Sequence, residues 1–183
     1  MKIAALSGSL RKGSSNAGIL RAFAAIAPAG VEVTLVEGLD ELPLFNPDLD
    51  GEGAVPPPPV KRFRDALFPV DAFVISSPEY AHGVPGAFKN ALDWIVSSGE
   101  LCGKPIVLIN ASPGGGEYVR RALLDTLTVM DANVLVEASL HTPFVRTILD
   151  ADGNVVDPSI LGQLRASLEA LRTAVAARQA RTD

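Results

Sequence analysis

Glycine and polar residues gather directly after the first apolar run of the chain. Residues 8–16 are Gly-Ser-Leu-Arg-Lys-Gly-Ser-Ser-Asn, and a helical pattern follows from Ala17 to Ile26. A helix N-terminus at such a loop offers free N–H groups and the positive end of the helix dipole. Hydroxyl, amide and guanidinium donors add to these, supplied by Ser9, Arg11, Ser14, Ser15 and Asn16. We therefore expect the loop to bind a phosphate group.

The spacing within this loop restricts which phosphate compound it suits. Gly8 and Gly13 are spaced as in loops that bind nucleoside triphosphates, but Ser14 stands where those loops have a lysine. No Gly-x-Gly-x-x-Gly pattern is present, so the pyrophosphate of a dinucleotide is not expected here. A phosphate monoester fits better. The alternative is a Ser/Gly-rich turn that only caps a helix.

Apolar runs alternate with helical patterns along the chain. Five predicted strands are Lys2–Ser7, Val31–Glu37, Ala72–Ser77, Pro105–Ala111 and Asn133–Leu140. Several of these runs are apolar without alternation, which is typical of parallel strands covered on both faces. We therefore expect one α/β domain spanning residues 1–183, a three-layer sandwich whose five-stranded parallel sheet has the flavodoxin-like order 2-1-3-4-5.

Two segments interrupt this alternation. The proline-rich stretch from Leu42 to Pro59 predicts an extended loop before a helix at Val60–Phe68. The stretch Thr142–Val156, with Asp-Ala-Asp-Gly-Asn at its centre, predicts a β-hairpin turn.

Two more loops of unusual composition follow predicted strands. Residues 78–86 are Pro-Glu-Tyr-Ala-His-Gly-Val-Pro-Gly, and residues 112–116 are Ser-Pro-Gly-Gly-Gly. Open α/β sheets bind ligands outside the carboxyl ends of their strands, so one ligand could touch all three loops. The second loop suits a flat ring, and the glycines can bring N–H groups to a ring edge. A phosphate at one end and a planar heterocycle at the other describe flavin mononucleotide (FMN).

Together these motifs resemble the NAD(P)H-dependent FMN reductase family. The resemblance rests on residues 8–16, on Ser-Pro-Glu-Tyr at 77–80 and on Val-Pro-Gly-Ala-Phe-Lys-Asn-Ala-Leu-Asp-Trp at 84–94, and it covers roughly the whole chain. That family has a flavodoxin-like fold and includes quinone, azo-dye and chromate reductases. The resemblance implies bound FMN, NAD(P)H as co-substrate, and a quinone, an azo or nitro compound, a metal oxyanion or free flavin as electron acceptor.

The resemblance also assigns residues to the cofactor. For the phosphate it implies Ser9, Arg11, Ser14 and Asn16, with Ser15 contributing mainly its backbone. For the isoalloxazine ring it implies Pro78, Glu79, Tyr80 and Ala81 on one side and Ser112, Gly114 and Gly115 on the other. Many relatives have Asn in place of Ala81, so one polar contact is expected to be missing. No catalytic acid or base is expected, and whether His82 faces substrate or solvent stays open.

Composition limits the other possibilities. The net charge of −5 argues against a nucleic-acid partner, and the single cysteine and two histidines predict no disulfide and no metal site. No apolar run has membrane-spanning length and no signal peptide is evident, so we expect a cytoplasmic protein with no membrane partner.

The helix predicted at Ala87–Ser97 has a wide apolar arc that includes Trp94. We expect this arc to form a subunit interface, because members of the resembled family are typically dimers or tetramers. Two alternative functions stay open: a flavodoxin-type electron carrier, which Arg11 argues against, and a flavin reductase that supplies reduced FMN to a monooxygenase.

Overall fold

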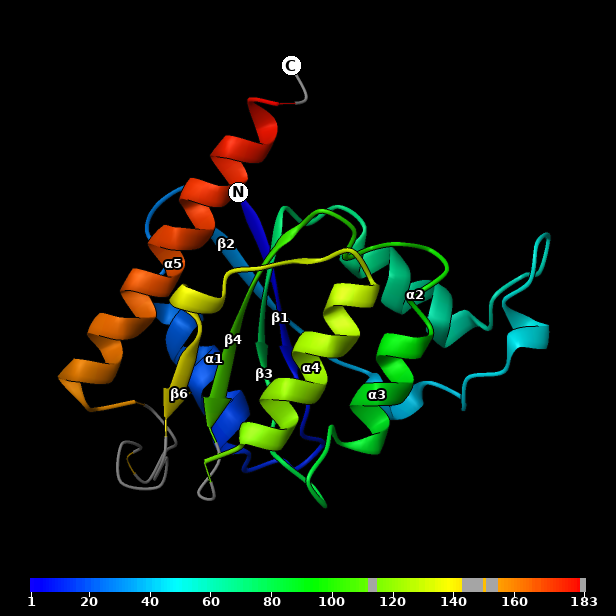
Figure 1. Ribbon diagram of the computed structural model, residues 1–183, viewed down its shortest axis with the longest axis horizontal. Coiled ribbons are helices and arrows are strands. Elements are labelled where there is room, and N and C mark those ends of the chain that lie inside the picture. The colour runs from blue at the N-terminus through cyan, green and yellow to red at the C-terminus, as the bar shows by residue number, and fades with distance from the viewer. Residues whose placement is uncertain (112–114, 143–149, 151–154, 182–183) are drawn as a thin grey trace.

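The computed structural model describes residues 1–111, 115–142, 150 and 155–181 (Figure 1). Its sheet runs in the order β2-β1-β3-β4-β5, and the paired strands are parallel. The strands are β1 (Lys2–Ser7), β2 (Glu32–Val36), β3 (Ala72–Ser76), β4 (Pro105–Ala111) and β5 (Asn133–Val134). The predicted strand order is therefore confirmed. The predicted hairpin turn at Thr142–Val156 lies largely outside the described residues.

Helices cover both faces of the sheet (Figure 1). One face packs on α1 (Ser15–Ala25) and α5 (Pro158–Gln179), and the other on α2 (Pro58–Leu67), α3 (Gly86–Asp93) and α4 (Glu117–Val129). Successive residues of β1 point to opposite faces, so Ile3 and Ala5 enter one core while Ala4 and Leu6 enter the other. This is why the strand is apolar without alternation.

The predicted fifth strand is divided in two, so the sheet has six strands among the described residues rather than the five predicted. A 3-10 turn, η3 (Val136–Ala138), separates β5 from β6 (Leu140–Thr142); β5 pairs with the start of β4 and β6 with its end. Ser139 explains the break. Its hydroxyl accepts from the Leu108 N–H at 3.0 Å and donates to the Leu135 carbonyl at 2.9 Å, so a side chain replaces the backbone ladder here.

The proline-rich segment after β2 contains two short 3-10 turns, η1 (Leu39–Glu41) and η2 (Pro47–Leu49), and packs on α3. The Trp94 indole N–H donates to the Pro43 carbonyl at 2.8 Å, and the Phe45 ring meets the Trp94 ring edge-on at 5.1 Å. Trp94 is fully buried within the single chain. The prediction that its arc faces another subunit is therefore wrong, because the chain's own loop covers it.

Hydrogen bonds to the helical layer fix this loop further. Asn90 accepts from the Phe45 N–H at 2.8 Å and donates to the Pro43 carbonyl at 3.0 Å. Asp50 accepts from Arg64 and from the Ser97 hydroxyl, each at 2.6 Å. Burial alone would raise the pKa of Asp50, but these bonds from Ser97 and Arg64 outweigh it and hold the pKa below its ordinary value.

No helix in the described part of the chain is long and apolar enough to cross a membrane.

Candidate functional site

The three predicted loops begin at the carboxyl ends of β1, β3 and β4, which are neighbours in the sheet. The first two loops touch. Gly8 donates its N–H to the Ser76 carbonyl at 2.8 Å, and a Cβ on Gly8 would lie only 2.4 Å from the Ser77 hydroxyl oxygen. Only glycine therefore fits at position 8, and its absence of a side chain lets the first two loops meet.

The first loop ends as the N-cap of α1. The Ser14 hydroxyl accepts from the Ala17 N–H at 3.5 Å, and the Ser14 N–H donates to the Arg11 carbonyl at 3.0 Å. The N–H groups of Ser15 and Asn16 therefore belong to the first helical turn, where a helix supplies no acceptor of its own. This is the arrangement that favours an anion.

The side chains of this loop differ in their freedom to bind a ligand. Arg11 is exposed, and no group in the described part of the chain pairs with its guanidinium. Asn16 is 4% exposed, and its amide oxygen accepts from the Ser76 hydroxyl at 2.8 Å. That bond leaves the Asn16 amide nitrogen and backbone N–H as its possible donors. Ser9 is half-buried and accepts from the Arg11 N–H at 3.3 Å.

The second loop closes in a tight turn. Tyr80 and Gly83 exchange two backbone hydrogen bonds, at 3.1 and 3.0 Å, and the residues between them, Ala81 and His82, have φ values of 49° and 57°. Left-handed conformations cost about 1–2 kcal/mol for most side chains but little for Asn or Gly. The Asn that the resemblance implies at position 81 therefore has a backbone explanation, independent of any contact with a ring.

Two side chains fasten this loop to α4. The Glu79 carboxylate accepts from the Val119 N–H at 3.1 Å, in the first turn of α4, and the His82 ring stacks on the Tyr118 ring at 4.0 Å and 10°. Glu79 is thereby committed to capping a helix, which argues against a role as catalytic base. The sequence does not predict these contacts, because they join residues about forty positions apart.

The third loop is described only from Gly115 onward, so Ser112 and Gly114 lie outside the described residues. Gly115 and Gly116 have φ values of 91° and 68°, and a Cβ on Gly116 would lie 2.2 Å from the Asn110 amide nitrogen. Asn110 donates to the Gly116 carbonyl at 2.6 Å and is 5% exposed. Asn110 was not among the predicted site residues, although a polar residue ending an otherwise apolar strand was a visible signal.

The donors at this edge fit FMN. An arginine in the loop that leads into the first-turn N–H groups of α1 suits a phosphate monoester, and the loops after β3 and β4 offer backbone to a flat ring. The buried amide oxygen of Asn110 has no hydrogen-bond partner among the described residues, which is unusual because such atoms are nearly always paired.

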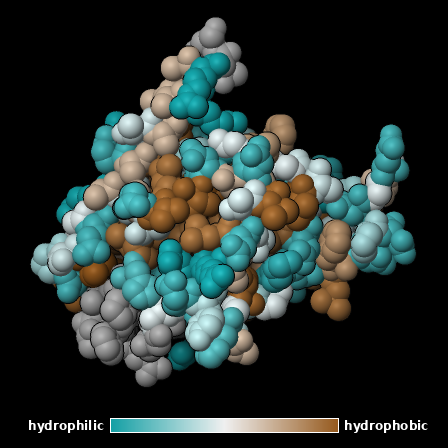
Figure 2. Space-filling view, viewed as in Figure 1, coloured by the Kyte–Doolittle hydropathy of each residue, from teal (hydrophilic) through white to brown (hydrophobic). Residues whose placement is uncertain are grey.

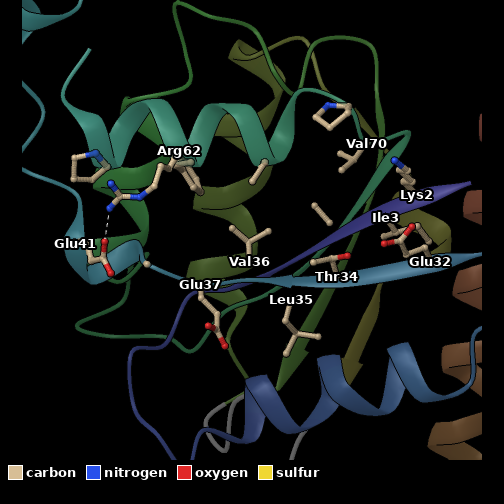
Figure 3. Close-up of a pocket in the computed structure, with 16 residues that line it drawn as sticks. Lys2, Ile3, Glu32, Thr34, Leu35, Val36, Glu37, Glu41, Arg62 and Val70 are labelled. Atoms are coloured by element: carbon tan, nitrogen blue, oxygen red, sulfur yellow. Dashed lines mark hydrogen bonds and ion pairs between the residues drawn. The ribbon is translucent and has the colours of Figure 1, made fainter. Parts of the chain in front are cut away.

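Two cavities lie near β2. One of about 360 Å³ runs between β2 and α2, and the ion pair between Glu41 and Arg62, at 2.6 Å, crosses one end (Figure 3). None of the predicted site residues lines it. The other, of about 280 Å³, reaches Ser9 and Lys12 of the first loop, with Arg21 beside them. The chemistry of the three loops, rather than cavity size, identifies the candidate site.

Comparisons with known proteins give the family of the chain. Residues 1–147 match a family model described as NADPH-dependent FMN reductase. The chain is 33% identical to a quinone reductase of Escherichia coli strain K12, covering 93% of each chain, and 31% identical to an NAD(P)H-dependent FMN reductase of Pseudomonas aeruginosa, covering 94% of each. Among solved structures it resembles FerB, a flavoenzyme NAD(P)H:(acceptor) oxidoreductase from Paracoccus denitrificans. The TM-score is 0.81 at 27% identity, over 94% of this chain and 98% of that one.

Proposed function

This chain belongs to the NADPH-dependent FMN reductase family, and we propose that it carries two electrons from NADPH, through FMN, to a quinone. The balanced reaction is NADPH, a proton and a quinone giving NADP⁺ and a hydroquinone. The chemistry that FMN supplies when bound is hydride acceptance at its N5 atom and storage of two electrons. The quinone as acceptor rests on relatives named quinone reductase.

The observation that carries this proposal is the loop that leads into the N-terminus of α1, in which the Arg11 guanidinium has no partner among the described residues. In the proposal, Arg11, the hydroxyls of Ser9 and Ser14 and the N–H groups of Ser15 and Asn16 hold the phosphate. Several donors to one dianion give a strong, oriented bond, since hydrogen bonds to charged groups contribute about 1.5–3 kcal/mol each.

The backbone of residues 78–81 orients the ring in this proposal, together with the glycines after β4. Glu79 contributes by fixing this loop to α4, not by moving a proton. The chain needs no acid or base of its own, because a hydroquinone can take its protons from water. Its tasks are to bind, to orient the two substrates in turn and to exclude water.

The test is steady-state NADPH oxidation with 1,4-naphthoquinone, measured on protein freed of loose flavin by gel filtration. The proposal expects turnover without added FMN. Turnover only when free FMN is added, with reduced FMN appearing in the filtrate, would favour a reductase that supplies reduced flavin to a partner enzyme. If neither NADPH nor NADH reduces the bound flavin, the protein would instead be an electron carrier.

We further propose a cytoplasmic homodimer or homotetramer. Hydrophobic side chains gather between α4 and α5, over the segment that contains β5 (Figure 2). Exposed hydrophobic residues near this segment include Val129, 82% exposed, and Val136, 47% exposed. Such a patch at a sheet edge is typical of subunit contacts. Light scattering of wild type and Val129→Glu tests this; a monomeric wild type would exclude it.

A location in the cytoplasm agrees with a lone cysteine and with the need for NADPH.

A further inference from the structure

Both tyrosines of the chain lie exposed at the candidate site. Tyr80 is 53% exposed and Tyr118 is 56% exposed, although the aromatic residues of the nearby motif, Phe88 and Trp94, are fully buried. Aromatic side chains left in solvent beside a ligand site commonly contact a ligand. Building on the proposed function, we propose that Tyr118, braced by His82, is the surface on which a flat acceptor ring packs.

The position of the stacked pair supports this role. His82 directly follows Ala81, the last residue of the loop proposed to line the isoalloxazine ring. Tyr118 lies two residues after Gly116, in the first turn of α4, and the N–H of its neighbour Val119 donates to the Glu79 carboxylate. The two stacked rings therefore bridge the loops that flank the ring site, at their solvent-exposed side.

The turn that contains His82 holds its ring against Tyr118. His82 has φ = 57°, a left-handed value that most side chains avoid, and its ring lies within 10° of parallel to the Tyr118 ring. The tight turn between Tyr80 and Gly83 sets this backbone conformation, and within it the imidazole lies over the phenol ring. The imidazole occupies one side of Tyr118 and restricts its rotation, while more than half of Tyr118 stays open to solvent.

A quinone matches the exposed part of Tyr118 in shape and electronics. A quinone ring is flat and electron-poor, and the phenol ring is electron-rich, so offset stacking between them is favourable. A contact of this kind changes an affinity by about two- to tenfold. An inorganic one-electron oxidant such as ferricyanide has no ring to stack, so it gains nothing from Tyr118.

The experiment compares kcat/KM for 1,4-naphthoquinone with that for ferricyanide in Tyr118→Leu. The ratio is expected to fall about two- to tenfold, mainly through a higher KM for the quinone. Tyr118→Phe keeps the ring and should keep the ratio. Phe68→Leu is the matched control: it removes another exposed aromatic ring, 75% exposed, at the amino edge of the sheet, and should not change the ratio.

His82→Asn tests the brace. Asparagine tolerates the left-handed conformation, so the turn should remain while the stacked ring is lost. We expect the ratio to fall as in Tyr118→Leu, with little change in the thermal midpoint of the FMN-free protein. The FMN dissociation constant, from fluorescence titration, should stay within about twofold in both variants, because neither ring is assigned to the cofactor.

The outcomes separate this inference from the proposed function. A wild-type protein that reduces neither acceptor would contradict the proposed function itself. A wild type that reduces both, with an unchanged ratio in Tyr118→Leu, would overturn only the role of Tyr118. An equal loss for both acceptors, accompanied by weaker FMN binding, would also overturn it, since Tyr118 would then act on the cofactor.

Discussion

Variants of Glu79 test whether this carboxylate holds its loop against α4 or transfers a proton during the reaction. Its carboxylate accepts the Val119 N–H at 3.1 Å, in the first turn of α4. Glu79→Ala removes both a helix cap, about 0.5–2 kcal/mol, and a favourable charge at the positive end of the helix, about 0.3–1 kcal/mol. We therefore expect the free energy of unfolding to fall by about 1–2 kcal/mol, which lowers Tm by roughly 2–8 °C at this chain length.

Glu79→Gln separates the two contributions. Its amide oxygen can still accept the Val119 N–H, so only the charge is lost, and the free energy of unfolding should fall by at most about 1 kcal/mol. The assay is urea unfolding of the FMN-free protein, followed by circular dichroism, with FMN titration of each variant. Glu79→Ala should also weaken FMN binding, because the loop after β3 loses one of its two links to α4.

Activity completes this test. If Glu79 acts by position, Glu79→Gln should retain most of the wild-type kcat, with an unchanged pH profile. If Glu79→Ala and Glu79→Gln both kept full stability but lost activity by a hundredfold or more, the carboxylate would be moving a proton, and the capping role of Glu79 would be refuted.

Three further changes test other parts of the account. Arg11→Ala should raise the FMN dissociation constant about ten- to a hundredfold while leaving the FMN-free protein as stable as wild type; an unchanged constant by fluorescence titration would remove Arg11 from the phosphate site. Gly116→Ala places a Cβ 2.2 Å from the Asn110 nitrogen at φ = 68° and should cost about 2–4 kcal/mol in urea unfolding, whereas Gly86→Ala, with open space around it, should not destabilise. The pKa of Asp50 is lowered in the folded protein, so its stabilisation is present above the unfolded-state pKa and lost as pH falls through the folded one; the stability advantage of wild type over Asp50→Asn should therefore shrink below about pH 4, and a constant difference would contradict this.

The sheet was largely predictable because its strands carry a strong local signal. The predicted bounds of β1 and β4 agree with the structure, since both are apolar runs with clear ends. The fifth strand was wrong because its break depends on the Ser139 hydroxyl, which bonds to Leu108 and Leu135. A serine within an apolar run does not reveal such partners.

The loops of the candidate site were predictable from the sequence, but the tertiary contacts that hold the second loop against α4 were not. Loop composition after three neighbouring strands was enough to expect a ligand at one edge of the sheet. The bond from Val119 to Glu79 and the stack of His82 on Tyr118 each depend on tertiary placement. The role of Trp94 was wrong for a related reason: a wide apolar arc does not say whether another subunit or a distant loop of the same chain covers it.

The central claim is that this chain binds FMN and passes electrons to it from NADPH. The most direct measurement is the visible absorption spectrum of the purified protein, loaded with FMN and freed of excess, before and after anaerobic addition of NADPH. We expect a flavin spectrum that stays with the protein and bleaches on reduction. A protein that cannot retain FMN, or whose flavin stays oxidised with both NADPH and NADH, would contradict it.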